Sequence, residues 1–112
     1  EYLNAPNTGY INTIELNSKN EIFIGTYNGV FISKDNGKNW LNYKNYDRTT
    51  KIRISLKDVI LINEIYPNHT YKIIISFDNG ISWEQISFLP GVNYGINFDK
   101  NDNLFLIPKF LK

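Results

Sequence analysis

One short pattern occurs twice in this chain, and its spacing constrains the fold more than any other feature. Residues 33–40 and 76–83 both read Ser-x-Asp-x-Gly-x-x-Trp, and the two aspartates, Asp35 and Asp78, are 43 residues apart. A unit that recurs every 40 to 45 residues or so is typical of chains built from four-stranded repeats. We therefore expect the 112 residues to form similar units that pack against one another.

The composition favours strands over helices. Alanine, the best helix former, occurs once, at Ala5, whereas isoleucine, tyrosine and asparagine are abundant. Branched and aromatic residues favour strands, and the Asn28-Gly29 pair is typical of a two-residue hairpin. Apolar runs bounded by turn residues predict strands over 11–16, 21–26, 30–33, 40–43, 51–56, 59–65, 71–77 and 81–88.

A third copy of the repeat begins after Pro90. Residues 91–106 align with residues 9–24 at a constant offset of 82 residues. We therefore divide the chain into the end of a preceding unit at 1–8, complete units at 9–44 and 50–89, and half a unit at 91–112. Four antiparallel strands at this period predict an all-β chain that forms part of a β-propeller, with two complete blades and partial blades at both ends.

The two repeated corners resemble the Asp box, or bacterial neuraminidase repeat, of sialidase-like and sortilin-like β-propellers. In such families the box lies between the third and fourth strands, away from the face that binds ligand. The resemblance therefore implies a structural role for both boxes, which consist of Ser33, Asp35, Gly37, Trp40, Ser76, Asp78, Gly80 and Trp83. The residue types agree with this role, because aspartate can accept the free N–H groups of a tight turn and glycine tolerates a positive φ.

Charge and composition argue against several classes of function. A net charge of +1 gives no basic excess for nucleic acid, and no apolar run is long enough for membrane insertion. The chain has no cysteine and one histidine, His69, so we predict neither a metal site nor a cofactor. The run from Asp99 to Asn103 begins like a calcium loop, but Leu104 replaces the required glycine, and a solvated turn is expected.

The resemblance to sialidases does not extend to their catalytic residues. Those enzymes hold the substrate carboxylate with three arginines, whereas Arg48 and Arg53 are the only arginines here. We therefore favour a non-catalytic module. The alternatives are a fragment of a sialidase-like hydrolase whose site other blades complete, and a purely structural scaffold. The resemblance also suggests a secreted or cell-surface location, where the sequon at 68–70 could be glycosylated.

A ligand face is expected opposite the Asp boxes, where the second-to-third-strand loops and the blade connections meet. Segments 4–10, 27–28, 44–50, 66–71 and 89–94 are rich in tyrosine and asparagine, which suit a glycan or a protein surface. The candidate ligand residues are Tyr27, Asn28, Tyr66, His69, Tyr71 and Tyr94. A chain with incomplete blades exposes apolar sheet at both ends, so further blades are expected from a longer chain or a homo-oligomer.

Overall fold

The computed structural model describes residues 9–44, 48–66, 70–86 and 94–109. These residues contain strands and turns but no helix, and so no helix that could cross a membrane. The strands are β1 (Ile11–Leu16), β2 (Ile22–Thr26), β3 (Gly29–Ser33), β4 (Leu41–Lys44), β5 (Arg48–Ile54), β6 (Ile60–Ile65), β7 (Tyr71–Ser76), β8 (Glu84–Ile86), β9 (Tyr94–Phe98) and β10 (Leu104–Pro108). The predicted all-β class is confirmed.

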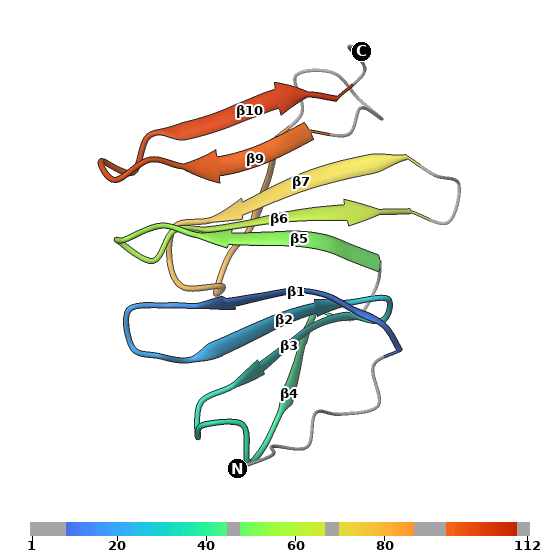
Figure 1. Ribbon diagram of the computed structural model, residues 1–112, viewed down its shortest axis with the longest axis vertical. Helices are drawn as coiled ribbons and strands as arrows, with labels where there is room; N and C mark the ends of the chain where they lie inside the picture. Colours follow the sequence, from blue (N-terminus) through green and yellow to red (C-terminus); the bar gives the residue numbers. More distant parts are fainter. Residues whose placement is uncertain (1–8, 45–47, 67–69, 87–93, 110–112) are drawn as a thin grey trace.

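The strands form three antiparallel sheets that follow one another along the chain (Figure 1). The first sheet has the order β1-β2-β3-β4 and the second the order β5-β6-β7-β8, so each is a four-stranded meander. The third sheet consists of β9 and β10. No sheet closes on itself within the described part of the chain.

Two strands differ from the sequence-based expectation by more than one residue. The strand expected over 81–88 begins only at Glu84, because Ile81 and Ser82 belong to the preceding corner, and the Ile81 side chain is 86% exposed. The strand expected over 51–56 spans Arg48–Ile54, because Ser55 and Leu56 form the next turn. Apolar residues that lie in turns, such as Ile81 and Leu56, therefore led the sequence-based prediction to place these strands too far into the turns.

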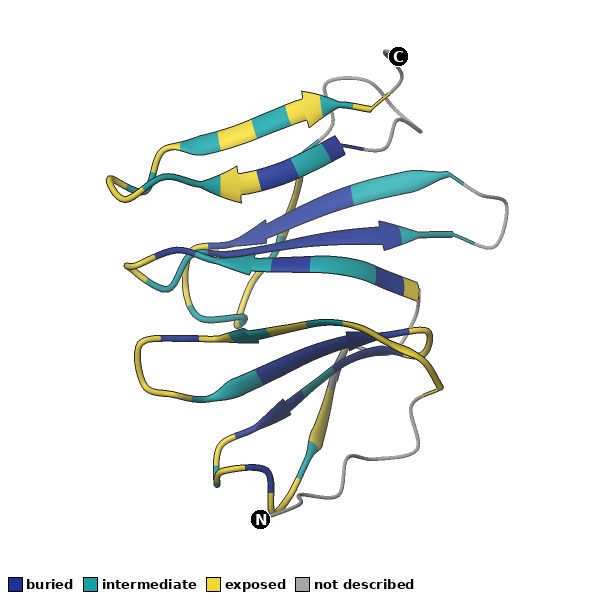
Figure 2. Ribbon diagram, viewed as in Figure 1, coloured by how far each residue is buried: buried dark blue, intermediate teal, exposed yellow. Residues whose placement is uncertain are grey.

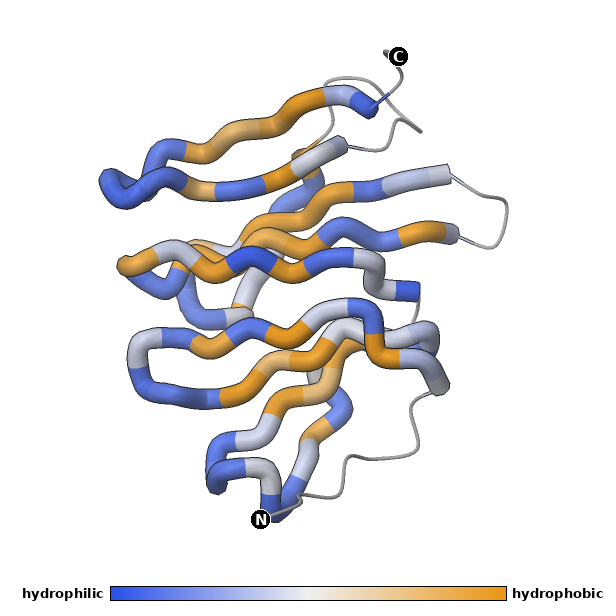
Figure 3. The backbone as a smooth tube through the Cα atoms, viewed as in Figure 1, coloured by the Kyte–Doolittle hydropathy of each residue, from blue (hydrophilic) through white to orange (hydrophobic). Residues whose placement is uncertain are grey.

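The core lies between the sheets and has two parts. The first part joins the first and second sheets and contains Phe23, Val30, Ile32, Ile52, Ile60, Ile62 and Ile74. The second part joins the second and third sheets and contains Leu61, Ile73, Ile75, Tyr94 and Ile96. Because successive residues of a strand point to opposite faces, Leu61 and Ile62 serve different parts. The second sheet is thus buried on both faces, as the dark blue and orange of β6 and β7 show (Figures 2 and 3).

Side chains of β1 satisfy backbone groups on the open edge of β5. The hydroxyl oxygen of Thr13 accepts a hydrogen bond from Ile52 N at 3.5 Å, and Glu15 Oε1 accepts one from Ile54 N at 3.3 Å. An edge strand presents unpaired N–H groups that invite other strands. The first sheet therefore protects the inner edge of the second.

The turns after β1, β5 and β9 have one design and link consecutive sheets. Each ends in a residue with positive φ, namely Asn20, Asp58 or Asp102. The carboxylate of Asp58 accepts from the backbone N–H of Ser18 at 2.8 Å. That of Asp102 accepts from the N–H groups of Leu56 and Lys57, both at 3.1 Å. Each aspartate thus ties its own turn to the turn of the preceding sheet.

Two glycines give a test of how closely the first and second sheets pack. A Cβ on Gly25 would lie 2.6 Å from the methyl groups of both Thr13 and Thr49, whereas a Cβ on Gly95 would meet nothing closer than 3.5 Å. We expect Gly25→Ala to lower the free energy of unfolding by about 1–3 kcal/mol, because one sheet must move. The matched variant Gly95→Ala should leave it unchanged or raise it, because alanine restricts the unfolded chain. Urea denaturation measures both, and equal effects would contradict the packing described.

Candidate functional site

The second repeated corner, between β7 and β8, is held by its own side chains. Ser76 Oγ donates to Asp78 Oδ1 at 2.8 Å and accepts from Gly80 N at 2.7 Å. The Asp78 carboxylate also accepts from the backbone N–H of Ser82 at 2.8 Å and from its hydroxyl. These bonds from Ser82, together with the one from Ser76, lower the pKa of Asp78 to about 2. The indole N–H of Trp83 closes the corner by donating to Gly80 O at 3.1 Å.

The first corner, between β3 and β4, repeats these bonds at equivalent atoms. Ser33 Oγ donates to Asp35 Oδ1 at 2.9 Å and accepts from Gly37 N at 2.8 Å. The Asp35 carboxylate accepts from Asn39 N and from the Asn39 side-chain amide, which lower its pKa. Trp40 Nε1 donates to Gly37 O at 3.1 Å, as in the second corner.

The chemistry of both corners supports a structural role. Asp35 and Asp78 already accept several hydrogen bonds, and Gly37 and Gly80 adopt φ values of 87° and 91°. Trp83 is half-buried against the core between the first two sheets. Both carboxylates therefore accept hydrogen bonds from their own turns.

The calcium-like run at Asp99 forms a turn of the kind expected. Asp99 Oδ1 accepts from the backbone N–H groups of Asn101 and Asn103, at 2.8 and 2.9 Å. Asp102, as described above, holds the turn of the second sheet. In the segments described, no three His, Cys, Asp or Glu side chains gather where they could hold a metal. The acidic residues of this run therefore organise backbone.

A cluster of exposed aromatic and cationic groups lies on the side of the sheets opposite the Asp boxes. It joins Tyr10, just before β1, Tyr27 in the β2–β3 turn and Arg48 at the start of β5. The Tyr10 and Tyr27 rings meet edge to face, with centroids 5.2 Å apart and an interplanar angle of 64°. The Arg48 guanidinium lies 4.0 Å from the centroid of the Tyr27 ring. Three separate segments thus form one surface, which we call the tyrosine–arginine cluster.

The cluster remains open to solvent. Tyr10 is 74% exposed and Tyr27 is 41% exposed, although each ring contacts the other. Arg48 and Asn28 are also exposed, and no carboxylate pairs with Arg48 among the residues that can be described. The tyrosine rings can stack on an apolar surface of a ligand, while the guanidinium of Arg48 donates hydrogen bonds to polar groups of the same ligand.

A buried carboxylate lies on the same side, in the second sheet. Glu64 is fully buried, and its Oε1 is 3.4 Å from the ammonium of Lys72 on the neighbouring strand. The ammonium also lies 4.6 Å from the centroid of the Tyr66 ring. Burial lowers the pKa of Lys72, but Tyr66 and Glu64 outweigh burial and raise it. Lys72 therefore stays charged and balances the buried Glu64.

The structure places the six predicted ligand residues in different environments. Tyr27 and Asn28 are exposed beside Arg48, and Tyr66 and Tyr71 are half-buried at the β6–β7 connection. Tyr94 is 5% exposed and packs in the core, because β9 begins at this residue and turns its ring toward the second sheet. His69 lies outside the described residues, as do 1–8, 45–47, 67–69, 87–93 and 110–112.

Two members of the tyrosine–arginine cluster were not singled out from the sequence. Tyr10 and Arg48 fall within the segments 4–10 and 44–50 that were assigned to the ligand face, but neither was a candidate residue. A lone arginine in a polar segment gives no local signal. It contacts Tyr27 only because β5 starts beside the β2–β3 turn.

Comparison with known proteins supports the interpretation of the second corner. Residues 74–85 match the family model described as the BNR/Asp-box repeat. The corner between β7 and β8 is therefore an Asp box, as the sequence suggested. Searches of curated proteins and of solved structures gave no match.

The low pKa of Asp78 predicts how the second corner responds to acid. A carboxyl whose pKa is lower in the folded state stabilises the fold above its unfolded pKa, and this contribution is lost as the pH falls through the folded value. Asp78→Asn should therefore destabilise the chain near neutral pH, and its difference from wild type should shrink from about pH 4 down to about pH 2. Urea unfolding at each pH measures this. Glu84→Gln, which removes a nearby exposed carboxylate, is the control, and a pH-independent difference would contradict the prediction.

Proposed function

We propose that this chain is a recognition module, part of an Asp-box β-propeller, and that its loop face binds a glycan. The tyrosine–arginine cluster carries the proposal. It combines exposed aromatic rings with an arginine that lacks a carboxylate partner among the described residues. The match to an Asp-box repeat supports the same kind of module.

The chemistry of the cluster suits a sugar ring. The apolar C–H face of a sugar can stack on a tyrosine ring, and its hydroxyl groups can accept from a guanidinium. The Arg48 guanidinium is held against Tyr27, so its position is set before a ligand arrives and less conformational entropy is lost on binding. The exposed Asn28 amide in the same turn adds a donor and an acceptor.

The position of the cluster also agrees with a binding role. It lies at the ends of strands from two sheets, opposite the corners that Asp35 and Asp78 hold. Loops on a rigid scaffold commonly carry binding residues. Here Arg48 belongs to β5 of the second sheet, in which the buried Glu64 pairs with Lys72. A change of an exposed cluster residue should therefore leave the fold intact.

Substitution of the two exposed tyrosines tests the proposal. Tyr27→Ala and Tyr10→Ala should each weaken binding of a glycan identified on an array by about tenfold or more, since central aromatic residues dominate such contacts. Titration calorimetry measures the affinity, and circular dichroism verifies folding. Phe77→Ala is the matched control, because Phe77 is 68% exposed but lies in the second Asp-box corner.

The control sets the outcome that would reject this function. If Phe77→Ala reduces binding as much as Tyr27→Ala, the loop face is not the binding face. If no glycan binds but a purified protein ligand depends on Tyr27 and Tyr10, the same surface recognises protein instead.

A further inference from the structure

Two sheet faces of this chain expose apolar side chains. On the first sheet, Ile14 is 61% exposed and Leu16 is 56% exposed, both on the face of β1 that points away from the second sheet. On the third sheet, Phe105 is 51% exposed and Ile107 is 63% exposed, both on the face of β10 that points away from the second sheet. Among the described residues, the stack of three sheets therefore exposes an apolar face on each side.

The repeat shows that these two faces are the two halves of a contact that the chain makes internally. At the offset of 82 residues, Phe105 corresponds to Phe23, which is fully buried between the first and second sheets. At the same offset, Ile14 corresponds to Ile96, which is buried against the second sheet. Each open face thus repeats a surface that is covered elsewhere in the same molecule.

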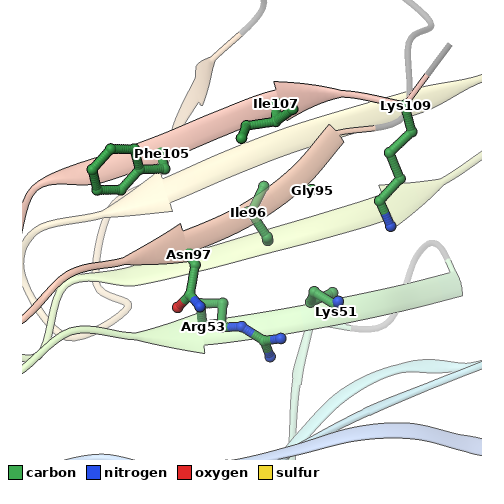
Figure 4. Close-up of a pocket in the computed structure, with 8 residues that line it drawn as sticks. All are labelled: Lys51, Arg53, Gly95, Ile96, Asn97, Phe105, Ile107 and Lys109. Atoms are coloured by element: carbon green, nitrogen blue, oxygen red, sulfur yellow. The ribbon is translucent and has the colours of Figure 1, made fainter. Parts of the chain in front are cut away.

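The face of the third sheet is also hollowed. A hollow of about 310 Å³ lies at the β9 edge of this face, beside β5, and Phe105 and Ile107 of β10 line it together with Gly95 and Ile96 of β9 (Figure 4). Its remaining lining residues are Lys51, Arg53, Asn97 and Lys109. Phe105 and Ile107 form the apolar side of the hollow, which offers a surface for incoming side chains such as those of Ile14 and Leu16.

The linking turns provide a second match between the two ends. Lys100 occupies the position in the third linking turn that Ser18 and Leu56 occupy in the first two. The N–H groups of Ser18 and Leu56 each donate to an aspartate of the following sheet, whereas the N–H of Lys100 has no partner in the described segments. In the turn of the first sheet, Asn20 occupies the position equivalent to Asp58 and Asp102, and its φ is positive like theirs. Its side-chain amide has no partner in those segments either, so Asn20 can accept from Lys100 of another molecule.

We propose that the open face of the third sheet binds the open face of the first sheet of a second copy of this chain, and that two copies close head to tail into one ring of six sheets. Propellers have roughly four to eight blades, so six sheets are enough to close. A head-to-tail contact forms a ring when its rotation closes and a filament when it does not. In the internal example β1 and β2 lie against β5, and Val30 and Ile32 of β3 join the same core.

Mass measurement with single variants tests the contact. The wild-type chain should sediment at twice its 13.1 kDa mass. Ile14→Lys and Phe105→Lys should each weaken dimerisation about tenfold or more, because each places a charge in an apolar contact. Both positions are more than half exposed, so the monomers should keep their circular dichroism spectra. If either monomer unfolds, Leu16→Thr and Ile107→Thr make the same test with residues that tolerate a strand.

A mixing experiment distinguishes head-to-tail contact from other dimers. Ile14→Lys keeps the third-sheet face and Phe105→Lys keeps the first-sheet face, so an equimolar mixture has one intact contact and should dimerise where each variant alone does not. A dimer in which like faces meet, first sheet on first sheet or third sheet on third sheet, would lose association through only one of the two variants, which would overturn the proposal.

A substitution in the linking turn of the first sheet should strengthen dimerisation instead of weakening it. Asn20→Asp supplies the carboxylate found at Asp58 and Asp102, so it should tighten dimerisation about fivefold, since a charged acceptor makes a stronger hydrogen bond. Asn20→Gly keeps the positive φ without the side chain and should weaken it. A wild-type chain that stays monomeric at every concentration would overturn the proposal and leave both faces to a different polypeptide. Assemblies larger than a pair would overturn closure by two copies.

Discussion

Aspartate carboxylates that accept backbone N–H groups hold this molecule together at its corners. Asp35 and Asp78 act within a sheet, where each closes the turn before the fourth strand. Asp58 and Asp102 act between sheets, where each binds the turn of the preceding unit. The strands are three to seven residues long, so the turns determine how one strand follows another. Hydrogen bonds from backbone N–H groups to aspartate thus determine both the turns within a sheet and the position of each sheet relative to the next.

The apolar core depends on each sheet being placed in the same way against the next. Alternation along the strands gives each sheet two apolar faces, and the second sheet uses both. A shift of one residue would exchange the faces and move Leu61 and Ile62 to the wrong neighbours. The side chains of Thr13 and Glu15 reinforce the register by binding N–H groups at the edge of β5. Polar bonds at the rim and apolar packing in the centre therefore specify the same arrangement.

Much of the fold could be predicted because its signals are local. The Asp box at 76–83 lies within eight residues, and the bonds that Ser76, Asp78, Gly80, Ser82 and Trp83 make as described above join residues of that segment. The roles of Asp58 and Asp102 depend on partners about 40 or more residues away, which turn chemistry alone does not indicate. Arg48 was not recognised for the same reason. Tyr94 was assigned to a connection, but alternation within β9 turns its ring into the core.

The repeated linking turn has a consequence for how such a chain can change over generations. The second unit carries both an acceptor for the unit before it, Asp58, and a donor to the unit after it, Leu56, within a single turn. Duplication of one unit in the gene therefore copies both sides of the joint, and the inserted sheet fits without any new surface having to arise. Deletion of a unit likewise leaves compatible neighbours. Lineages of such chains can gain or lose whole sheets while every remaining joint keeps its chemistry.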